Sequence, residues 1–473
     1  MVIVGNGMAG HRLAQELRAR RPEVRVTLVG EEPRPAYNRV LLSTVLAGTV
    51  SADALELADC GARMRLGVRA LELDTERRRV TLSDGSVLGY ETLVLATGAR
   101  PVLPRVPGLA ADDGGPAPGV STFRTLADCT LISRLALGGS MAVLGGGLLG
   151  VEAARGLAGL GVDVTLVHPV GHLMENQLDP EAGEVLARML RDLGVRVLLG
   201  VGASRWQPSP DEGELVLSDG RAVRCGGVVV TAGVAPVTEL ARSAGLAVGR
   251  GVVVDDRLRT SAPGVYAIGE CAEHRGVCHG LVGPCWEQAA VLADVLVGKD
   301  TEYTGSRPVV RLKARDVDLA AMGRVPAEPD GDTELVRVSD VTRGRYGVLA
   351  LRAERLVGAI LLGLPDATGP VTQLHDSGSP APADRFGLLL GTGAAVSETP
   401  DKLPERALVC RCNGVTKARL VEAWHAGARD PEALSVLHLG HHRLRQLFGH
   451  RAAAVHLAGA RGRLTVHGRP GRP

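Results

Sequence analysis

The chain has 473 residues, a formal net charge of +2, 45% hydrophobic residues and 2% aromatic residues. This length exceeds what one hydrophobic core supports, so we expect about three or four domains. The scarcity of aromatic residues argues against stacking platforms for nucleic acid, and no apolar run approaches the ~18 residues of a membrane span. The eight cysteines form no regular framework, which favours reduced thiols, and the first motif begins too early for a signal peptide. We therefore expect a cytoplasmic protein that binds neither nucleic acid nor a membrane.

A glycine-rich turn follows the first apolar run, over residues 2–4, and its glycines are Gly5, Gly7 and Gly10. At this spacing the first glycine permits a tight strand-to-helix turn, the second lets the backbone approach a pyrophosphate, and the third lets the helix pack on its strand. The phosphates then lie at the positive end of the helix dipole. We expect a nucleotide-binding turn, a helix over residues 8–21 and a strand over residues 24–29.

A second glycine turn repeats this spacing later in the chain, with Gly145, Gly147 and Gly150. Two such turns indicate two dinucleotides, and we expect electrons to pass between them. The strand over residues 162–167 ends at His168, where an NAD-selective site usually has an acid. The missing carboxylate removes one barrier to NADPH, but no arginine follows at once to hold a 2′-phosphate. His168 is therefore either part of this site or a plain surface histidine. The choice between NADH and NADPH also stays open.

Longer stretches of the chain carry a family resemblance. Residues 4–12, 30–33 and 37–43 resemble the FAD-dependent pyridine-nucleotide disulfide oxidoreductases, most of all the flavin part of the NAD(P)H nitrite reductase large subunit and of the assimilatory nitrate reductase electron-transfer subunit. The likeness extends to about Leu434. It implies an α/β fold with two Rossmann-like domains for FAD and NAD(P), an α+β third domain and a partial C-terminal 2Fe-2S segment like that of bacterioferritin-associated ferredoxin.

The resemblance also implies domain boundaries, with a flavin domain that the chain leaves and later re-enters. The third domain is expected to pack against the flavin or against a second copy of the chain in a homodimer. The expected ranges are 1–115 and 246–300 for the FAD-binding domain, 116–245 for the NAD(P)-binding domain, 301–395 for the α+β interface domain, 405–437 for the partial 2Fe-2S domain, and 438–473 for an aberrant, frameshifted and disordered tail.

Three later stretches match places where the backbone of relatives passes the cofactors. Residues 93–98 match the crossing out of the flavin domain, residues 230–236 match the return, and residues 260–270 match a motif whose terminal acid accepts a hydrogen bond from the ribityl chain of FAD. That acid is Glu270, where the wider family usually has Asp. An ordinary tight turn is the alternative for each stretch alone, but their order favours the cofactor role. The residues so assigned are Thr97, Gly98, Gly233, Gly269 and Glu270, with Glu152 near the nicotinamide.

Two charged residues near the first turn are further candidates for cofactor contacts. Glu31 lies roughly 20 residues after the turn, where a carboxylate can bind the ribose hydroxyls of an adenosine. A solvated loop charge is the alternative for Glu31. Arg39 is either a contact to the flavin or substrate or an exposed arginine in a salt bridge.

The cysteines limit what the flavin can do next. Residues 38–46, which correspond to the redox-active thiol segment of thiol-disulfide reductases in this superfamily, contain no cysteine, and no Cys-X-X-Cys occurs anywhere. We therefore expect no dithiol exchange. Cys271, Cys278 and Cys285 are seven residues apart, which fits no common thiolate metal motif.

The expected metal ligands are Cys410 and Cys412. Residues 407–417 resemble the start of a small domain that binds a 2Fe-2S cluster through Cys-X-Cys and, some 30 residues on, through Cys-X-X-Cys. Four thiolates close such a cluster, and this chain offers two. The cluster is therefore expected to have an incomplete ligand set.

The tail offers a reason for the missing pair. After Glu432 no acid appears, and six of the thirteen histidines crowd in. Residues 438–448, back-translated with GC-ending codons and read one base later, encode a Cys-X-X-Cys at about the expected distance. We interpret the tail as the product of a frameshift between about Leu434 and His438, and we expect it to be disordered. A genuine basic tail that binds metal or an acidic partner is the alternative.

The resemblance implies hydride transfer from NAD(P)H to FAD, followed by release of single electrons toward iron. The acceptor is expected in a partner, either a nitrite or nitrate reductase catalytic subunit or a small iron-sulfur protein. No side chain is assigned as an acid or a base. Two alternatives stay open: a ferredoxin or rubredoxin reductase, and a flavin redox sensor that binds the nicotinamide cofactor without rapid turnover.

Overall fold

The computed structural model describes residues 1–328, 330–392, 405, 408–410, 414–428, 453–458 and 463–468. The chain divides into two compact units, each assembled from distant segments. Unit 1 comprises residues 1–41, 55–102 and 233–308, and unit 2 comprises residues 42–54, 103–232 and 309–473. The chain thus leaves unit 1 after residue 102 and returns at residue 233. The domain ranges expected from the resemblance stay predictions.

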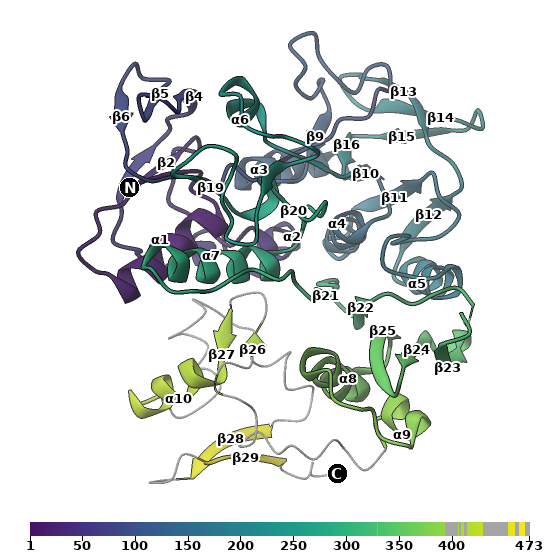
Figure 1. The fold of residues 1–473 in the computed structure, drawn as a ribbon. Helices are drawn as coiled ribbons and strands as arrows, with labels where there is room; N and C mark the ends of the chain where they lie inside the picture. Colours follow the sequence, from purple (N-terminus) through teal and green to yellow (C-terminus); the bar gives the residue numbers. More distant parts are fainter. Residues whose placement is uncertain are drawn as a thin grey trace. The chain divides into compact units, whose positions relative to one another are not determined.

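Unit 1 is built on a five-stranded parallel sheet in the order β19-β7-β1-β2-β3. Helices α1 and α7 lie side by side in Figure 1, and both contribute leucines to the core beneath the sheet. The helix expected over residues 8–21 is confirmed, and it ends at Arg20, one residue earlier than expected. The bounds are β1 Val2–Val4, β2 Thr27–Gly30, β3 Arg63–Leu66, β7 Leu93–Leu95, β19 Val265–Ala267, α1 Met8–Arg20 and α7 Val282–Leu296.

Smaller sheets complete unit 1. Strands β4, β5 and β6 form an antiparallel sheet, and β18 pairs with β20 in parallel. The two crossing segments of the chain, β8 and β17, pair with each other as an antiparallel ribbon. The bounds are β4 Ala70–Asp74, β5 Arg79–Leu82, β6 Val87–Gly89, β8 Ala99–Pro101, β17 Val234–Pro236, β18 Val252–Val254, β20 Ala272–His274 and α6 Glu239–Ser243.

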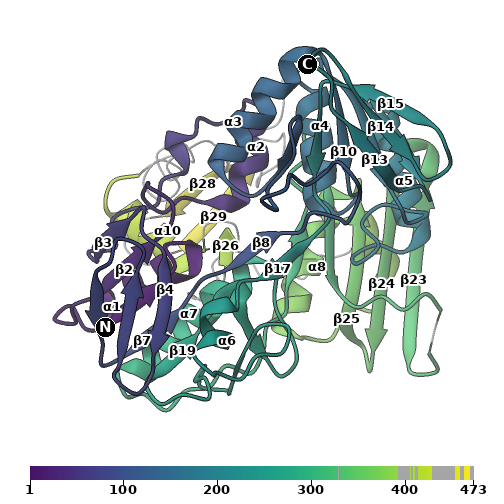
Figure 2. The same cartoon turned by 90° about the horizontal axis from the view of Figure 1, so that it is seen from above.

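Unit 2 contains a second five-stranded parallel sheet, in the order β12-β11-β10-β16-β9. Strands β13, β14 and β15 form an antiparallel sheet. Residues 42–54 belong to this unit because α2 packs against α3 and α4, as Figure 2 shows. The bounds are β9 Val120–Thr122, β10 Ser140–Leu144, β11 Asp163–His168, β12 Val195–Leu199, β13 Ala203–Gln207, β14 Gly213–Leu217, β15 Ala222–Cys225, β16 Gly227–Val230, α2 Leu42–Leu46, α3 Leu126–Leu135, α4 Leu148–Ala158 and α5 Pro180–Asp192.

The rest of unit 2 includes the expected α+β domain. Its antiparallel sheet has the order β21-β22-β25-β24-β23, and α8 and α9 share a hydrophobic core with it. The fold class is therefore confirmed as α/β with an α+β third domain. The bounds are β21 Val309–Arg311, β22 Leu319–Gly323, β23 Thr333–Asp340, β24 Arg345–Arg352, β25 Arg355–Leu362, α8 Pro365–Ser377 and α9 Arg385–Leu390.

Only parts of the C-terminal region are described. Strands β26 Leu408–Cys410 and β27 Val415–Thr416 pair and lead into α10 Lys417–His425. Strands β28 Ala453–Ala458 and β29 Arg463–Gly468 form an antiparallel pair within the stretch expected to be disordered. Most of that stretch lies outside the described residues, so its disorder stays a prediction.

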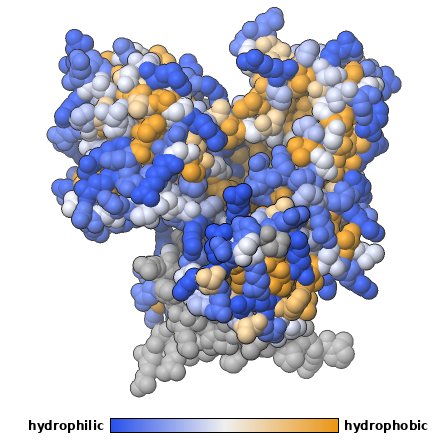
Figure 3. All heavy atoms as spheres, turned by 45° about the vertical axis from the view of Figure 1, so that its right-hand side comes forward, coloured by the Kyte–Doolittle hydropathy of each residue, from blue (hydrophilic) through white to orange (hydrophobic). Residues whose placement is uncertain are grey.

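Polar residues cover much of the surface visible in Figure 3, and apolar residues gather in separate patches between them. Large apolar side chains that are exposed include Phe386 and Leu390 of α9. Among the described residues, no helix combines the length and the hydropathy that crossing a membrane requires.

Candidate functional site

The first glycine turn joins β1 to α1 in unit 1. Gly5 has φ +119°, and a Cβ there would lie 2.0 Å from the carbonyl oxygen of Ala96. A Cβ on Gly10 would lie 2.2 Å from the carbonyl oxygen of Gly5. A Cβ on Gly7 would meet nothing within 4 Å. The first and third glycines are thus required by the backbone, while the second faces open space at the N-terminus of α1, where an anion is favoured.

The second glycine turn, between β10 and α4, has the same geometry. Gly145 has φ +112°, and its Cβ would lie 2.5 Å from the carbonyl oxygen of Thr231. A Cβ on Gly150 would lie 1.8 Å from the oxygen of Gly145, and one on Gly147 would meet nothing within 4 Å. The sequence prediction of two nucleotide-binding turns therefore agrees with the backbone of both units.

The strand end beside the first turn offers polar groups to a nucleotide. The side chain of Glu31 is 71% exposed, and its nearest ion-pair partner is the guanidinium of Arg69 at 3.7 Å. The Oδ1 atom of Asn6 is buried and accepts no hydrogen bond from the described residues. An exposed carboxylate and a buried vacant acceptor fit the ribose and neighbouring groups of an adenosine.

Arg39 is held by its own neighbours. Its guanidinium forms an ion pair with Glu32, donates to the hydroxyl of Tyr37 at 3.0 Å and lies 4.7 Å from the centre of that ring. Tyr37 in turn donates to Glu32 at 2.8 Å. Arg39 thus takes part in a salt bridge that is half-buried rather than exposed, and its contact to the flavin or substrate stays a prediction.

Thr97, Gly98 and Gly233 lie at the paired crossings. The hydroxyl of Thr97 donates to the carbonyl of Val237 at 2.8 Å, and the N–H of Val237 donates to the carbonyl of Gly98 at 2.9 Å. The carbonyl of Gly233 accepts from the N–H of Val102 at 3.0 Å. Thr97 and Gly98 therefore close one end of the ribbon of β8 and β17, and Gly233 closes the other end.

Gly269 and Glu270 lie in a short turn after β19, and Glu270 is half-buried. The N–H of Gly269 donates to Oε1 of Gln288 on α7 at 2.7 Å. A Cβ on Gly269 would lie 2.9 Å from that of Ala9 on α1, so this turn closely approaches the helix of the first glycine turn. The role of Gln288 in holding this turn appears only in the fold, because α7 follows the turn by more than ten residues in the sequence.

Glu152 on α4 is only 3% exposed and has a partner that the sequence did not suggest. Its Oε1 accepts the backbone N–H of Lys313 at 2.8 Å, and the ammonium Nζ of Lys313 lies 3.5 Å away. One turn later, Arg155 donates to the carbonyl of Arg315 and pairs with Asp316 at 2.7 Å. Two side chains of α4, Glu152 and Arg155, thus hold the segment after β21. Glu152 and Lys313 are 161 residues apart in the sequence, and no motif indicates that they pair.

His168 is buried, not a surface histidine. Its Nδ1 accepts the N–H of Gly146 in the second glycine turn at 3.0 Å, and its Nε2 lies 3.1 Å from Oε2 of Glu175. The ring packs against the turn, because a Cβ on Gly146 would lie 2.7 Å from its Cγ. The alternative of a plain surface residue is therefore wrong.

The thiols near these sites suit packing better than redox chemistry. Burial raises the pKa of Cys271, and that of Cys129 to about 12, so both stay protonated. In the part of the chain that the structure describes, no group of three or more His, Cys, Asp or Glu side chains could hold a metal ion. Cys410 ends strand β26, while Cys412 and the tail after Ala428 up to residue 452 lie outside the described residues.

Comparison with known proteins agrees with this geometry. A family model described as pyridine nucleotide-disulphide oxidoreductase matches residues 1–290. A second model, described as the rubredoxin NAD+ reductase C-terminal domain, matches residues 308–366. The two models thus cover both glycine turns and the whole sheet of β21–β25.

Two curated relatives come from Bacillus subtilis (strain 168). The chain is 34% identical over 435 residues to nitrite reductase NAD(P)H, covering 89% of this chain and 53% of that protein. It is also 34% identical over 438 residues to the assimilatory nitrate reductase electron transfer subunit, covering 90% and 55%. The chain spans about half the length of these relatives.

One solved structure shares most of the fold. The covalent putidaredoxin reductase-putidaredoxin complex matches with a TM-score of 0.74 and 27% identity, over 84% of this chain and 99% of that chain. This chain therefore belongs to the pyridine nucleotide-disulphide oxidoreductase family, whose members bind FAD and NAD(P)H.

Proposed function

We propose that the chain is a cytoplasmic flavoprotein reductase that passes electrons from NAD(P)H through FAD to a one-electron acceptor in nitrite or nitrate assimilation. The observation that carries this proposal is the matched pair of glycine turns, each open at its second glycine. The named activities of the two Bacillus relatives support the assignment to nitrogen assimilation. The acceptor is a nitrite or nitrate reductase catalytic subunit or a small iron-sulfur protein.

The residues of unit 1 fit FAD. The pyrophosphate would bind at the open face of Gly7 at the start of α1. The exposed carboxylate of Glu31 would accept hydrogen bonds from the ribose hydroxyls. Thr97 and Gly98 fix the crossing, while Glu270 lies in a turn that Gln288 of α7 holds through the N–H of Gly269. When bound, FAD supplies the chemistry that takes up a hydride and gives up single electrons.

The residues of unit 2 fit the nicotinamide cofactor in the same way. Gly147 leaves the N-terminus of α4 open for its pyrophosphate, and Glu152 lies one turn further along the helix. The Lys313 ammonium and N–H hold the Glu152 carboxylate in one orientation. We assign Glu152 to positioning the nicotinamide end and assign no side chain as an acid or a base.

A ferredoxin or rubredoxin reductase is the second candidate. The match of residues 308–366 to the rubredoxin reductase C-terminal domain and the likeness to putidaredoxin reductase favour it. The Cys-Arg-Cys motif at Cys410 and Cys412 favours the first candidate, because it resembles half of a 2Fe-2S ligand set. We propose that the other half was lost by the frameshift, and resequencing the gene across codons 430–440 tests this directly.

The decisive experiment is rapid mixing of the FAD-loaded protein with NADH or NADPH under anaerobic conditions. Fast bleaching of flavin absorbance, followed by electron transfer to a nitrite or nitrate reductase partner, is the expected result. Transfer to a ferredoxin or rubredoxin alone would establish the second candidate. A slow, long-lived charge-transfer complex without transfer would indicate a redox sensor, and a protein that binds no FAD would overturn the proposal.

A further inference from the structure

We propose that Glu175, positioned by His168, makes the second nucleotide site select NADH over NADPH. This inference rests on the proposed function, since it assigns the nucleotide specificity of that same site. It arises from an oddity of the sequence: β11 ends in a histidine where a carboxylate usually meets the adenosine ribose. The fold supplies that carboxylate from another residue.

The imidazole of His168 connects the glycine turn to Glu175. Its Nδ1 accepts the N–H of Gly146, so the ring proton of the neutral form is on Nε2, which donates to Oε2 of Glu175 at 3.1 Å. The His168 side chain is 5% exposed, whereas that of Glu175 is 31% exposed. The carboxylate therefore lies one imidazole ring away from the turn and still faces solvent, where a nucleotide can reach it.

The backbone before Glu175 is fixed against the same turn. Met174 is buried with φ +53°, a conformation that is uncommon outside glycine. Its N–H donates to the carbonyl of Gly146 at 2.9 Å, and its carbonyl accepts from Gln177 at 2.8 Å and Leu178 at 2.9 Å. Such a backbone persists when its surroundings hold it in place, so the position of Glu175 is set by the fold and not by a free loop.

The charges along this segment oppose a 2′-phosphate. Between Arg155 and Arg188 the sequence contains no lysine or arginine, but it contains five carboxylates. A 2′-phosphate adds negative charge and is normally held by arginine near the strand end. The Nε2 proton of His168 is already donated to Glu175. The carboxylate of Glu175 can accept hydrogen bonds from the adenosine ribose hydroxyls of NADH, and it repels the 2′-phosphate of NADPH.

Equilibrium binding of NAD+ and NADP+ to the full FAD-loaded chain, measured by isothermal titration calorimetry, tests this inference without turnover. The wild type should bind NAD+ more tightly. Glu175→Gln, which keeps the shape and removes the charge, should lower the Kd ratio of NADP+ to NAD+ by about tenfold. The matched control is Glu184→Gln, which removes an exposed carboxylate paired with Arg191 on α5 and should change the ratio less than about twofold.

The positioning role of His168 has its own variants. His168→Leu should lower the same ratio as Glu175→Gln does, and His168→Gln, whose amide can both accept and donate, should restore it. An unchanged ratio in Glu175→Gln, or equal binding of the two nucleotides by the wild type, would overturn the inference while leaving the proposed function intact. Failure to bind either nucleotide would instead contradict the proposed function.

Discussion

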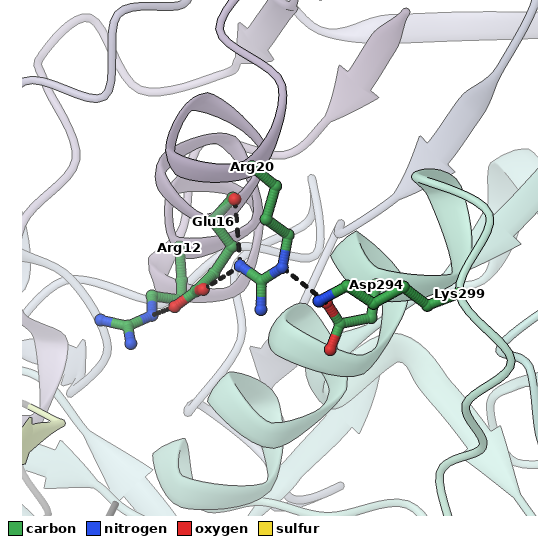
Figure 4. Close-up of polar contacts among 5 residues, drawn as sticks. All are labelled: Arg12, Glu16, Arg20, Asp294 and Lys299. Atoms are coloured by element: carbon green, nitrogen blue, oxygen red, sulfur yellow. Dashed lines mark hydrogen bonds and ion pairs between the residues drawn. The ribbon is translucent and has the colours of Figure 1, made fainter. Parts of the chain in front are cut away.

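Arg12 and Glu152 occupy the same place in the two glycine turns, two residues after the third glycine, but their surroundings differ. Arg12 on α1 begins a chain of ion pairs along the surface of α1 and α7, which Figure 4 shows. Glu152 on α4 is buried and has one cationic partner, Lys313. The members of the surface chain are Arg12, Glu16, Arg20, Asp294 and Lys299.

This difference teaches how much one motif position determines. In the surface chain the inner members each have two partners and all keep some contact with water, so losing one ion is tolerable. In the buried pair, losing one ion leaves the other without compensation in a low dielectric. The glycines give both turns the same backbone conformation. The partners of Arg12 and Glu152, which come from other segments of the chain, decide how much each side chain contributes to stability.

The largest loss of stability is expected for Lys313→Met. The variant keeps the backbone N–H that donates to Glu152 but removes the buried ammonium, leaving an unpaired carboxylate. We expect a loss of about 3–5 kcal/mol in the free energy of unfolding, the usual cost of leaving one charge of a buried pair alone. Denaturant unfolding followed by far-UV circular dichroism measures it.

A double variant separates charge from packing at this pair. Glu152→Gln combined with Lys313→Met removes both charges and should recover most of the lost stability. If the double variant is as unstable as Lys313→Met alone, then packing of the lysine stem and not the ion pair accounts for the effect.

Substitutions in the two glycine turns should destabilise the backbone equally, but each should affect a different cofactor. Gly10→Ala and Gly150→Ala each place a Cβ within 2.2 Å of a backbone oxygen. Each should cost about 1–3 kcal/mol of local stability. Gly10→Ala should lose FAD, seen as lost visible absorbance, whereas Gly150→Ala should keep FAD but lose its reduction by NAD(P)H.

The control for this pair uses the second glycines. Gly7→Ala and Gly147→Ala meet no protein atom within 4 Å, so the fold should tolerate both. Each should weaken only the nucleotide of its own turn. A Gly147→Ala variant that loses FAD as well would contradict the assignment of the two turns to separate cofactors.

A smaller effect is expected in the surface chain. Asp294→Asn removes one of the two carboxylates that pair with Arg20, and Glu16 remains. We expect a loss of about 0.2–1 kcal/mol that diminishes at high salt, since ion pairs that keep contact with water are screened. Thermal unfolding at low and high salt measures it, and a loss as large as that of Lys313→Met would erase the distinction between the two regions.

A further effect, on the pH dependence of stability, concerns His11, the neighbour of Arg12 on α1. Burial lowers the pKa of His11 from 6.5, and its Nε2 lies 2.8 Å from the carbonyl of Ala58. As the pH falls, His11 therefore binds a proton near pH 6.5 in the unfolded chain but only at lower pH in the folded chain. The free energy of unfolding decreases as the pH falls below 6.5. The slope cannot exceed about 1.4 kcal/mol per pH unit.

The comparison variant for this pH effect is His11→Gln, which cannot titrate. Between pH 7.5 and 5.5 the wild type should lose more stability than the variant does, as measured by urea unfolding. Parallel pH profiles of the two proteins would show that His11 is protonated equally in the folded and unfolded states.

Much of the fold could be predicted from the sequence because the decisive constraints are local. Gly5 and Gly145 need a positive φ, and Gly10 and Gly150 need a missing Cβ, whatever surrounds them. These requirements are visible as spacing along the chain. The helix after the first turn was likewise predictable from the sequence, and the α+β domain was expected from the family resemblance.

The side chains around the turns were less predictable. The sequence placed Glu152 and His168 at the second site but not Lys313, Glu175 or the buried state of His168. A helix position specifies which way a side chain leaves the backbone, but its partner can come from any later segment.

By itself, the sequence determined the two glycine turns, because backbone geometry and glycine spacing act over a few residues. Only the tertiary structure decided which charges are buried and paired. Lys313 reaches Glu152 across 161 residues, and Asp294 reaches Arg20 across 274. Electrostatic partners depend on distance in space and on exclusion of water, and neither quantity is written along the chain.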